Sequence, residues 1–164
     1  MVKLILIGFM GSGKTTIGYR LAKKLSIPQL DLDALIVQET NRSINDIFAE
    51  AGEKYFRKIE TRVLKKAIDQ NVILSTGGGT PINKINRILL KSTGVPIVFL
   101  STEFETIEKR INQDANRPLA KKTTEFRQRY IKRYRVYRAL ADIEIITDGI
   151  KPEAIVETIL DKLL

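Results

Sequence analysis

The residues Gly8-Phe-Met-Gly-Ser-Gly-Lys-Thr15 match the pattern Gly-x-x-x-x-Gly-Lys-[Ser/Thr], which is typical of a loop that binds nucleotide phosphates. Glycines in such a loop let backbone N–H groups turn towards phosphate oxygens, and the following helix adds the positive end of its dipole. Lys14 is expected to contact the β- and γ-phosphates, and the Thr15 hydroxyl to bind Mg²⁺. The alternative is an ordinary glycine-rich turn with a solvated lysine.

Two carboxylates are candidates for the metal that accompanies a nucleotide. Neither of the later apolar segments, 71–75 and 95–100, ends in the Asp that many nucleotide-binding proteins use for this purpose. Asp31 and Asp33 follow the second apolar segment and would share one side of an extended stretch. One could then hold the metal while the other meets an acceptor hydroxyl. Alternatively, Asp33 only caps a helix over 34–39.

A second group of residues could bind an acceptor. Three consecutive glycines, Gly77 to Gly79, follow the apolar segment 71–75, at the edge of a parallel sheet where ligands bind. They either let the backbone approach a small ligand or form a flexible turn. Arg57 precedes Glu60 by three residues on an expected helix, so the carboxylate could orient the guanidinium. Pairs of this kind are also common on helix surfaces.

Composition narrows the chemistry that these residues can perform. The chain has 164 residues, 43% of them hydrophobic and 29% charged, which predicts one domain over 1–164. It has no Cys and no His, so disulfides, thiolate or imidazole metal sites and Ser-His-Asp catalysis are excluded. No segment resembles a secretory leader or approaches the ~18 apolar residues of a membrane helix. We therefore expect a cytoplasmic protein without a membrane partner.

The positive charge of the chain is concentrated in one region. Residues 109–138 contain eleven Lys and Arg against two acids, so this segment alone carries the net charge of +9. A local excess of this kind favours a local anion site over a general surface for polyanions.

The elements that must position these residues follow from the hydrophobic pattern. Short apolar runs alternate with helical patterns along the chain, which predicts an α/β fold with a parallel sheet. Strands are expected at 2–7, 28–31, 71–75, 95–100 and 143–147.

Helical spacing marks the segments between these strands. Ile17, Leu21 and Leu25 mark one expected apolar face. Phe56, Ile59, Val63 and Ala67 mark another. Ser43 followed by Asp46 is typical of a helix start, and a turn at 148–152 leads into a C-terminal helix ending at Leu164.

The basic region divides into two parts. Residues 112–124 have weak periodicity and several turn-forming residues, which predicts a mobile loop. The helix after this loop carries Phe126, Tyr130, Tyr134 and Tyr137 along one side. This spacing favours core packing over a platform on which nucleic-acid bases stack.

Five motifs together carry a resemblance to a known family. In chain order they are Gly8-Phe-Met-Gly-Ser-Gly-Lys-Thr-Thr16, Asp31-Leu-Asp33, Ile47-Phe-Ala-Glu-Ala-Gly-Glu-Lys-Tyr-Phe-Arg-Lys-Ile-Glu60, Ser75-Thr-Gly-Gly-Gly79 and Arg117-Pro-Leu119. In this order and at these intervals, they resemble shikimate kinase over nearly the whole chain. The resemblance implies transfer of the γ-phosphoryl group of ATP to the 3-hydroxyl of shikimate, a step towards chorismate and the aromatic amino acids. It also implies a three-layer αβα fold of the P-loop kinase type, with a five-stranded parallel sheet in the order 2-3-1-4-5 and a closing lid.

The resemblance also implies roles for individual residues. It places Gly11, Ser12, Gly13, Lys14, Thr15, Thr16, Arg110 and Arg117 at ATP, with Arg110 against the adenine and Arg117 in the lid at about 112–124. It places Thr15 and Asp31 at Mg²⁺. It implies a shikimate-binding region at about 33–60. The residues that it assigns to shikimate, within this region and beyond it, are Asp33, Arg57, Gly77, Gly78, Gly79, Arg133, Phe48, Phe56 and Glu60. Lys14, Asp33 and Arg117 would be catalytic, and the protein would act as a monomer.

One departure bears on these assignments. The family often has Arg-x-Pro-Leu-Tyr where this chain has Arg133-Tyr-Arg-Val-Tyr137, so the choice of Arg133 rests on its distance from Tyr137. Two arginines suit the carboxylate of shikimate, because a guanidinium offers forked donors. Other interpretations are a kinase for gluconate or a nucleoside monophosphate, and a P-loop protein that binds nucleic acid through its basic segment.

Overall fold

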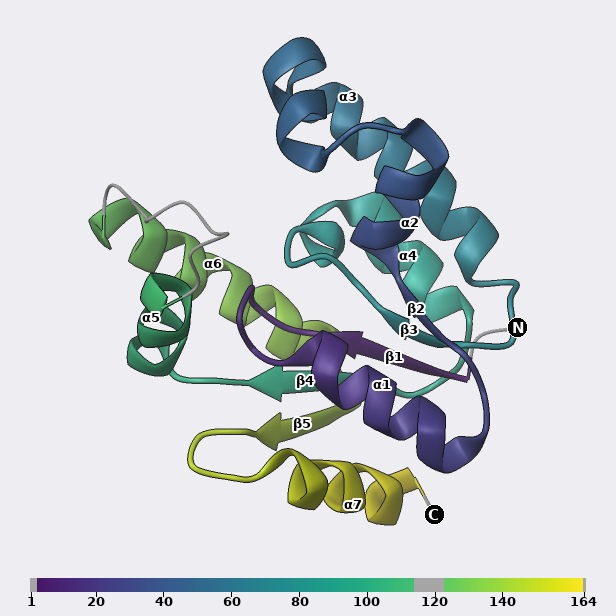
Figure 1. The fold of residues 1–164 in the computed structure, drawn as a ribbon, viewed down its shortest axis with the longest axis vertical. Coiled ribbons are helices and arrows are strands. Elements are labelled where there is room, and N and C mark those ends of the chain that lie inside the picture. Colours follow the sequence, from purple (N-terminus) through teal and green to yellow (C-terminus); the bar gives the residue numbers. More distant parts are fainter. Residues whose placement is uncertain (1–2, 114–122, 164) are drawn as a thin grey trace.

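The computed structural model describes residues 3–113 and 123–163, which form a five-stranded, wholly parallel sheet between layers of helices (Figure 1). The strands are β1 (Leu4–Ile7), β2 (Gln29–Asp31), β3 (Ile73–Ser75), β4 (Ile97–Ser101) and β5 (Ile143–Ile146). The helices are α1 (Lys14–Leu25), α2 (Leu32–Thr40), α3 (Ile44–Ala67), the 3₁₀ turn η1 (Thr80–Ile82), α4 (Lys84–Ser92), α5 (Phe104–Gln113), α6 (Thr123–Leu140) and α7 (Pro152–Leu163). The strand order is β2-β3-β1-β4-β5, so the fold class and strand order that the sequence predicted are confirmed.

The central strand β1 shows why the sheet needs helices on both faces. Its alternate residues enter two different cores: Leu4 and Leu6 join one cluster of buried side chains, and Ile5 and Ile7 join the other. All four are buried, as a continuous apolar run in a parallel sheet requires. The cluster with Leu4 is closed by α1 and α7, and the cluster with Ile5 by α2 to α6. The two helical layers lie on opposite sides of the strands in Figure 1.

The expected helix signals are largely present. Ser43 caps α3 and accepts a hydrogen bond from the Asp46 N–H at 3.0 Å. The face marked by Phe56 is buried along its length. The expected aromatic side of α6 packs into the core, with Phe126 and Tyr137 buried and the two tyrosines between them packed against the same cluster. The aromatic residues of α6 therefore serve the core.

Two local expectations were wrong. Leu25 does not share the buried face of Ile17 and Leu21, because it is the last residue of α1 and is 41% exposed. The extended stretch from Asp31 to Asp33 is interrupted, because β2 ends at Asp31 and α2 begins at Leu32. Asp31 is the residue that caps α2, with its Oδ1 accepting from the Ala34 N–H at 3.1 Å, so Asp33 lies in the first helical turn.

The topology brings the sequence motifs to one edge of the sheet. The phosphate loop follows β1, Asp33 follows β2, the three glycines follow β3 and a turn into α7 follows β5. Since all strands are parallel, their carboxyl ends meet at this edge, where open α/β sheets bind ligands. Within the described part of the chain, no helix combines the length and apolar character needed to cross a bilayer.

Candidate active site

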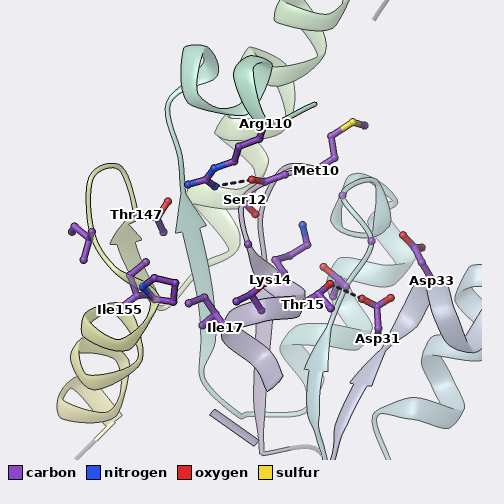
Figure 2. A pocket seen from close by; sticks show the side chains of 18 residues that line it. Met10, Ser12, Lys14, Thr15, Ile17, Asp31, Asp33, Arg110, Thr147 and Ile155 are labelled. Carbon is purple, nitrogen blue, oxygen red and sulfur yellow. Dashed lines mark hydrogen bonds between the residues drawn. The ribbon is translucent and has the colours of Figure 1, made fainter. Parts of the chain in front are cut away.

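A cleft of about 510 Å³ lies at the carboxyl ends of the strands (Figure 2). It runs from Asp31 and Asp33, past the phosphate loop, to Thr147 and Ile155 on the other side. The predicted site residues that line it are Gly11, Ser12, Gly13, Lys14, Thr15, Thr16, Asp31, Asp33, Gly77, Gly78 and Arg110. The structure therefore brings together residues that are more than 90 positions apart in the sequence. The predicted residues that the structure describes but that do not line it are Phe48, Phe56, Arg57, Glu60, Gly79 and Arg133.

The phosphate loop has the backbone geometry that its glycines permit. Gly11 and Gly13 adopt positive φ angles of 78° and 94°, and Gly13 is the residue before the first turn of α1. No acidic residue lies in that turn, so the N–H groups at the start of the helix leave a positive dipole end facing the cleft. Lys14 Nζ donates to the carbonyls of Gly8 at 2.7 Å and Phe9 at 3.0 Å. Its cation is thereby held across the loop.

Asp31 makes two contacts at once. Its Oδ1 caps α2, and its Oδ2 accepts from the Thr15 hydroxyl at 3.1 Å. This pair lies beside the phosphate loop and lines the cleft. A hydroxyl and a carboxylate are oxygen donors of the kind that Mg²⁺ prefers, and Mg²⁺ commonly takes few protein ligands. Among the described residues no group of three or more His, Cys, Asp or Glu is placed so that it could hold a metal ion.

Asp33 is a carboxylate in an unusual electrostatic position. Its pKa is raised to about 6, first by burial and then by the nearby carboxylates of Asp31 and Glu60, against the opposing effect of Lys14 and Arg57. A carboxylate with such a pKa is close to the range in which general bases operate. Its position is also restricted, since a Cβ on Gly77 would lie 2.6 Å from Asp33 Oδ1.

The three glycines lie against three of the predicted acceptor residues. Gly77 contacts Asp33, as described above. A Cβ on Gly79 would lie 2.3 Å from Arg57 Nη2, and one on Gly78 would lie 3.3 Å from Arg133 Nη1. The glycines therefore admit two guanidinium groups and one carboxylate to the same short stretch of backbone. This close approach distinguishes them from a flexible turn.

Arg57 is held by a buried carboxylate. Its Nη1 donates to both oxygens of Glu60, at 2.9 and 3.0 Å, and Glu60 is 1% exposed. The guanidinium carbon lies 5.1 Å from the centre of the Phe56 ring, which itself packs 4.8 Å from the Phe48 ring. Arg57 and Glu60 thus form a partly buried pair next to the glycines, and the interpretation as a simple surface ion pair was wrong.

Arg133 reaches the glycines from α6. Its guanidinium lies beside the Tyr137 hydroxyl and 5.8 Å from the centre of the Phe9 ring. Tyr137 in turn donates to the Gly78 carbonyl at 2.5 Å. Burial holds the pKa of Arg133 below its usual range, and Arg57 contributes in the same direction. The two positively charged guanidinium groups repel each other beside the cleft, and an anionic ligand would reduce this repulsion.

The other side of the cleft contains residues that the sequence did not single out. Thr147, Ile150 and Pro152, from the turn between β5 and α7, line it together with Arg110. Arg110 extends from α5 and donates to the Gly11 carbonyl at 2.8 Å. The predicted turn at 148–152 signalled this wall, because loops after parallel strands commonly line ligand sites. Arg117 and most of the predicted lid lie outside the described residues.

A parallel sheet in this order, with a phosphate loop after its first strand and an anion-attracting site beside that loop, defines a P-loop kinase of small molecules. The model of the shikimate kinase family matches residues 10–164. The chain belongs to the shikimate kinase family. It is accordingly an ATP-dependent kinase, a phosphotransferase.

Individual proteins support the same placement. A shikimate kinase of Persephonella marina is 41% identical over 165 residues, which cover 99% of each chain. A shikimate kinase of Acinetobacter baumannii, solved in complex with shikimate, is 34% identical with a TM-score of 0.90, covering 98% of this chain and 91% of that one. A gluconokinase of Sinorhizobium meliloti has a TM-score of 0.67 at 15% identity, covering 98% and 90% of the two chains, and shares the fold alone.

Proposed function

We propose that this protein transfers the γ-phosphoryl group of MgATP to the 3-hydroxyl of shikimate, giving shikimate 3-phosphate on the route to chorismate. The observation that carries the proposal is the convergence of Asp33, Arg57 and Arg133 on Gly77 to Gly79, next to a phosphate loop, in a chain of this family. Shikimate is a small carboxylate with hydroxyls. It therefore needs both cationic donors and a hydroxyl-accepting group.

The nucleotide occupies the side of the cleft formed by the phosphate loop. Backbone N–H groups from Gly11 to Thr16 bind its phosphates, supported by the Ser12 hydroxyl and the dipole of α1. Lys14 exchanges its contacts with loop carbonyls for the β- and γ-phosphate oxygens and stabilises charge on the transferring group. Arg110 lies against the adenine, on the side of the cleft that the turn from β5 to α7 also lines. Arg117 adds a second cation to the transferring group.

Thr15 and Asp31 fit Mg²⁺, since their oxygens are 3.1 Å apart and line the cleft beside the phosphate loop. When bound, the ion neutralises charge on the β- and γ-phosphate oxygens. Asp31 remains anchored by its contact with the Ala34 N–H. This anchoring keeps the carboxylate close to Thr15.

The acceptor occupies the side of the cleft near the glycines. Arg57 and Arg133 bind its carboxylate with forked N–H donors, aided by the backbone at Gly78. Gly77, Gly79, Phe48, Phe56 and Glu60 shape the surrounding wall. Asp33 accepts a hydrogen bond from the 3-hydroxyl and takes its proton as the new O–P bond forms and the bond to the β,γ-bridging oxygen breaks. Since the transition state of phosphoryl transfer is loose, positioning contributes more than basicity.

The remaining features of the proposal concern organisation. The chain acts as a cytoplasmic monomer whose residues 1–164 form one domain. Residues at about 33–60 form the acceptor-binding region, and those at about 112–124 form a lid. Closing the lid adds positive charge from the basic segment and excludes water, which would otherwise compete as acceptor.

Coupled ADP release tests the proposal. Purified protein is assayed with MgATP and, in separate reactions, shikimate, quinate, gluconate, AMP, CMP and single-stranded DNA. We expect saturable ADP release with shikimate and background release with the others. Background release with shikimate, together with a response to another acceptor, would refute the assignment of the acceptor while leaving the phosphate loop intact. Stimulation by DNA with a steep dependence on salt would indicate the nucleic-acid alternative.

A further inference from the structure

Behind Arg57 and Glu60 lies a second layer of buried polar side chains. Thr80 and Asn86 are both fully buried, and neither was singled out by its sequence context. Thr80 is the first residue of η1, directly after Gly79, and Asn86 lies in the first turn of α4. Both reach the same carboxylate on α3.

The carboxylate of Glu60 is fully satisfied by this arrangement. The Thr80 hydroxyl donates to Oε2 at 2.8 Å, and Asn86 Nδ2 donates to Oε1 at 3.2 Å. Arg57 Nη1 donates to both oxygens. Each oxygen therefore has one neutral donor in addition to the cation, as a buried carboxylate requires.

The contacts of Asn86 determine the orientation of its amide. Its Nδ2 also donates to the Thr80 carbonyl at 3.1 Å, and its Oδ1 accepts from the Thr61 hydroxyl at 2.7 Å. The opposite orientation would place Oδ1 against the Glu60 carboxylate, with two acceptors facing each other. Asn86 thereby connects α4 with α3 and with the backbone just after the three glycines.

We propose that Asn86 and Thr80 are positioning residues for the acceptor site, which act through Glu60 to hold the Arg57 guanidinium against Gly79. This inference rests on the proposed function, because it concerns how firmly Arg57 binds the carboxylate of shikimate. Each residue donates a hydrogen bond to Glu60 and reaches Arg57 through that carboxylate. Their effect on the acceptor is therefore indirect.

The physical reason lies in the number of donors that Glu60 needs. With its neutral donors removed, the buried carboxylate depends on Arg57 alone and draws the guanidinium towards itself and away from the acceptor. Arg57 Nη1 is already used by Glu60, and Nη2 also contacts Glu53 at 3.3 Å. Small displacements of the guanidinium therefore change the donors left for a ligand, whereas the nucleotide side of the cleft is unaffected.

Steady-state kinetics with each substrate varied separately test this inference. The variants are Asn86→Leu and Thr80→Val, which keep similar side-chain volume and remove the donors. Thr80→Ser keeps the hydroxyl. Thr93→Val is the matched control, because Thr93 is a buried threonine just after α4. Its hydroxyl donates to the Leu90 carbonyl at 2.7 Å and accepts from the Val95 N–H at 3.4 Å, so its hydrogen bonds are local and do not go to Glu60.

We expect Asn86→Leu and Thr80→Val each to raise the KM for shikimate about tenfold, as for the loss of a hydrogen bond to a charged group. The KM for ATP and kcat should stay near the wild-type values, since binding of the acceptor carboxylate is the same in the ground and transition states. Thr80→Ser should restore the wild-type KM. Thr93→Val should lower Tm and leave both KM values unchanged.

The effect of these variants on the KM for shikimate should also depend on the presence of the Glu60 carboxylate. In a Glu60→Gln background, Asn86→Leu should raise the KM for shikimate much less than in the wild type, because no buried carboxylate needs the amide. An unchanged KM for shikimate, or equal increases for both substrates, would overturn the inference. If Asn86→Leu does not fold, the Thr80→Val and Thr80→Ser pair decides the question. Failure of the proposed function is distinct, because the wild-type protein would then not phosphorylate shikimate.

Discussion

Replacing Gly79 with alanine perturbs the acceptor site through a single methyl group. The backbone at Gly79 has φ −86° and ψ −11°, which alanine adopts without strain. The new Cβ would lie 2.3 Å from Arg57 Nη2, 2.8 Å from Nη1 and 2.9 Å from Cζ. Ordinary contact begins at about 3.4 Å, so the guanidinium must retreat by roughly 1 Å. The variant thus displaces one functional group without changing its chemistry.

The expected cost follows from the contacts that oppose this movement. Arg57 is anchored to Glu60 at 2.9 and 3.0 Å, so it can retreat only by weakening those bonds or by moving the buried carboxylate. A misplacement of about 1 Å can cost on the order of 100-fold in rate, and we expect a loss of this size in kcat/KM for shikimate. Because the clashing atoms lie at the end of a flexible side chain, the fold should be retained.

The assay is steady-state kinetics with shikimate and ATP varied separately, accompanied by thermal unfolding. Gly78→Ala is the matched control, because its Cβ would lie 3.3 Å from Arg133 Nη1 and requires a shift of only a few tenths of an ångström. Its loss of kcat/KM for shikimate should be markedly smaller. Wild-type kinetics for Gly79→Ala, a larger loss for Gly78→Ala, or equal losses for both substrates would refute this reasoning.

The remaining predictions concern Asp33, Asp31 and Lys14. Asp33→Asn should lower kcat by at least ~100-fold with the fold retained, measured by coupled ADP release; near-normal turnover would remove Asp33 from the mechanism. Because the pKa of Asp33 is raised to about 6, wild-type kcat/KM should fall as the pH drops below this value. Because a raised pKa means that ionising Asp33 opposes folding, the stability of the wild type should decline from about pH 4 to pH 6 relative to that of Asp33→Asn. Above pH 6 the variant should be more stable by roughly 1–3 kcal/mol, measured by thermal unfolding. Equal pH profiles of stability for the two proteins would contradict this. Asp31→Asn keeps a residue that caps α2 as well as Asp does, so Tm should hold while the Mg²⁺ concentration for half-maximal activity rises several-fold; an unchanged Mg²⁺ requirement would exclude Asp31 from the metal site. Lys14→Met should abolish measurable ATP turnover, and retained turnover would contradict the role of its cation.

The sheet was predictable because its signals are local. Each strand is a short apolar run, and the phosphate-loop motif fixes where β1 ends and α1 begins. The boundary between β2 and α2 was not predictable in the same way, because Asp31 serves as both the end of a strand and the cap of a helix. Two acids two residues apart fit an extended segment as well as a helix start.

Site residues that belong to a sequence motif were predictable. Residues whose role depends on tertiary contacts were less predictable. The motifs identified Arg57 and Glu60, but only the fold shows that Glu60 is buried and that Gly79 makes room for Arg57. Asn86 carries no motif, and its partners come from segments 6 and 25 to 26 residues away. The cleft wall at Pro152 likewise depends on tertiary packing.

Direct identification of the product tests the central claim most strictly. The protein is incubated with MgATP and shikimate, and the mixture is followed by ³¹P and ¹H NMR. The account predicts a new phosphate monoester coupled to the proton on carbon 3 of the ring, formed in equal amount to ADP and at least ~100-fold more slowly with the Asp33→Asn variant. ADP formed together with inorganic phosphate and unchanged shikimate, or a phosphate on a different hydroxyl, would contradict it.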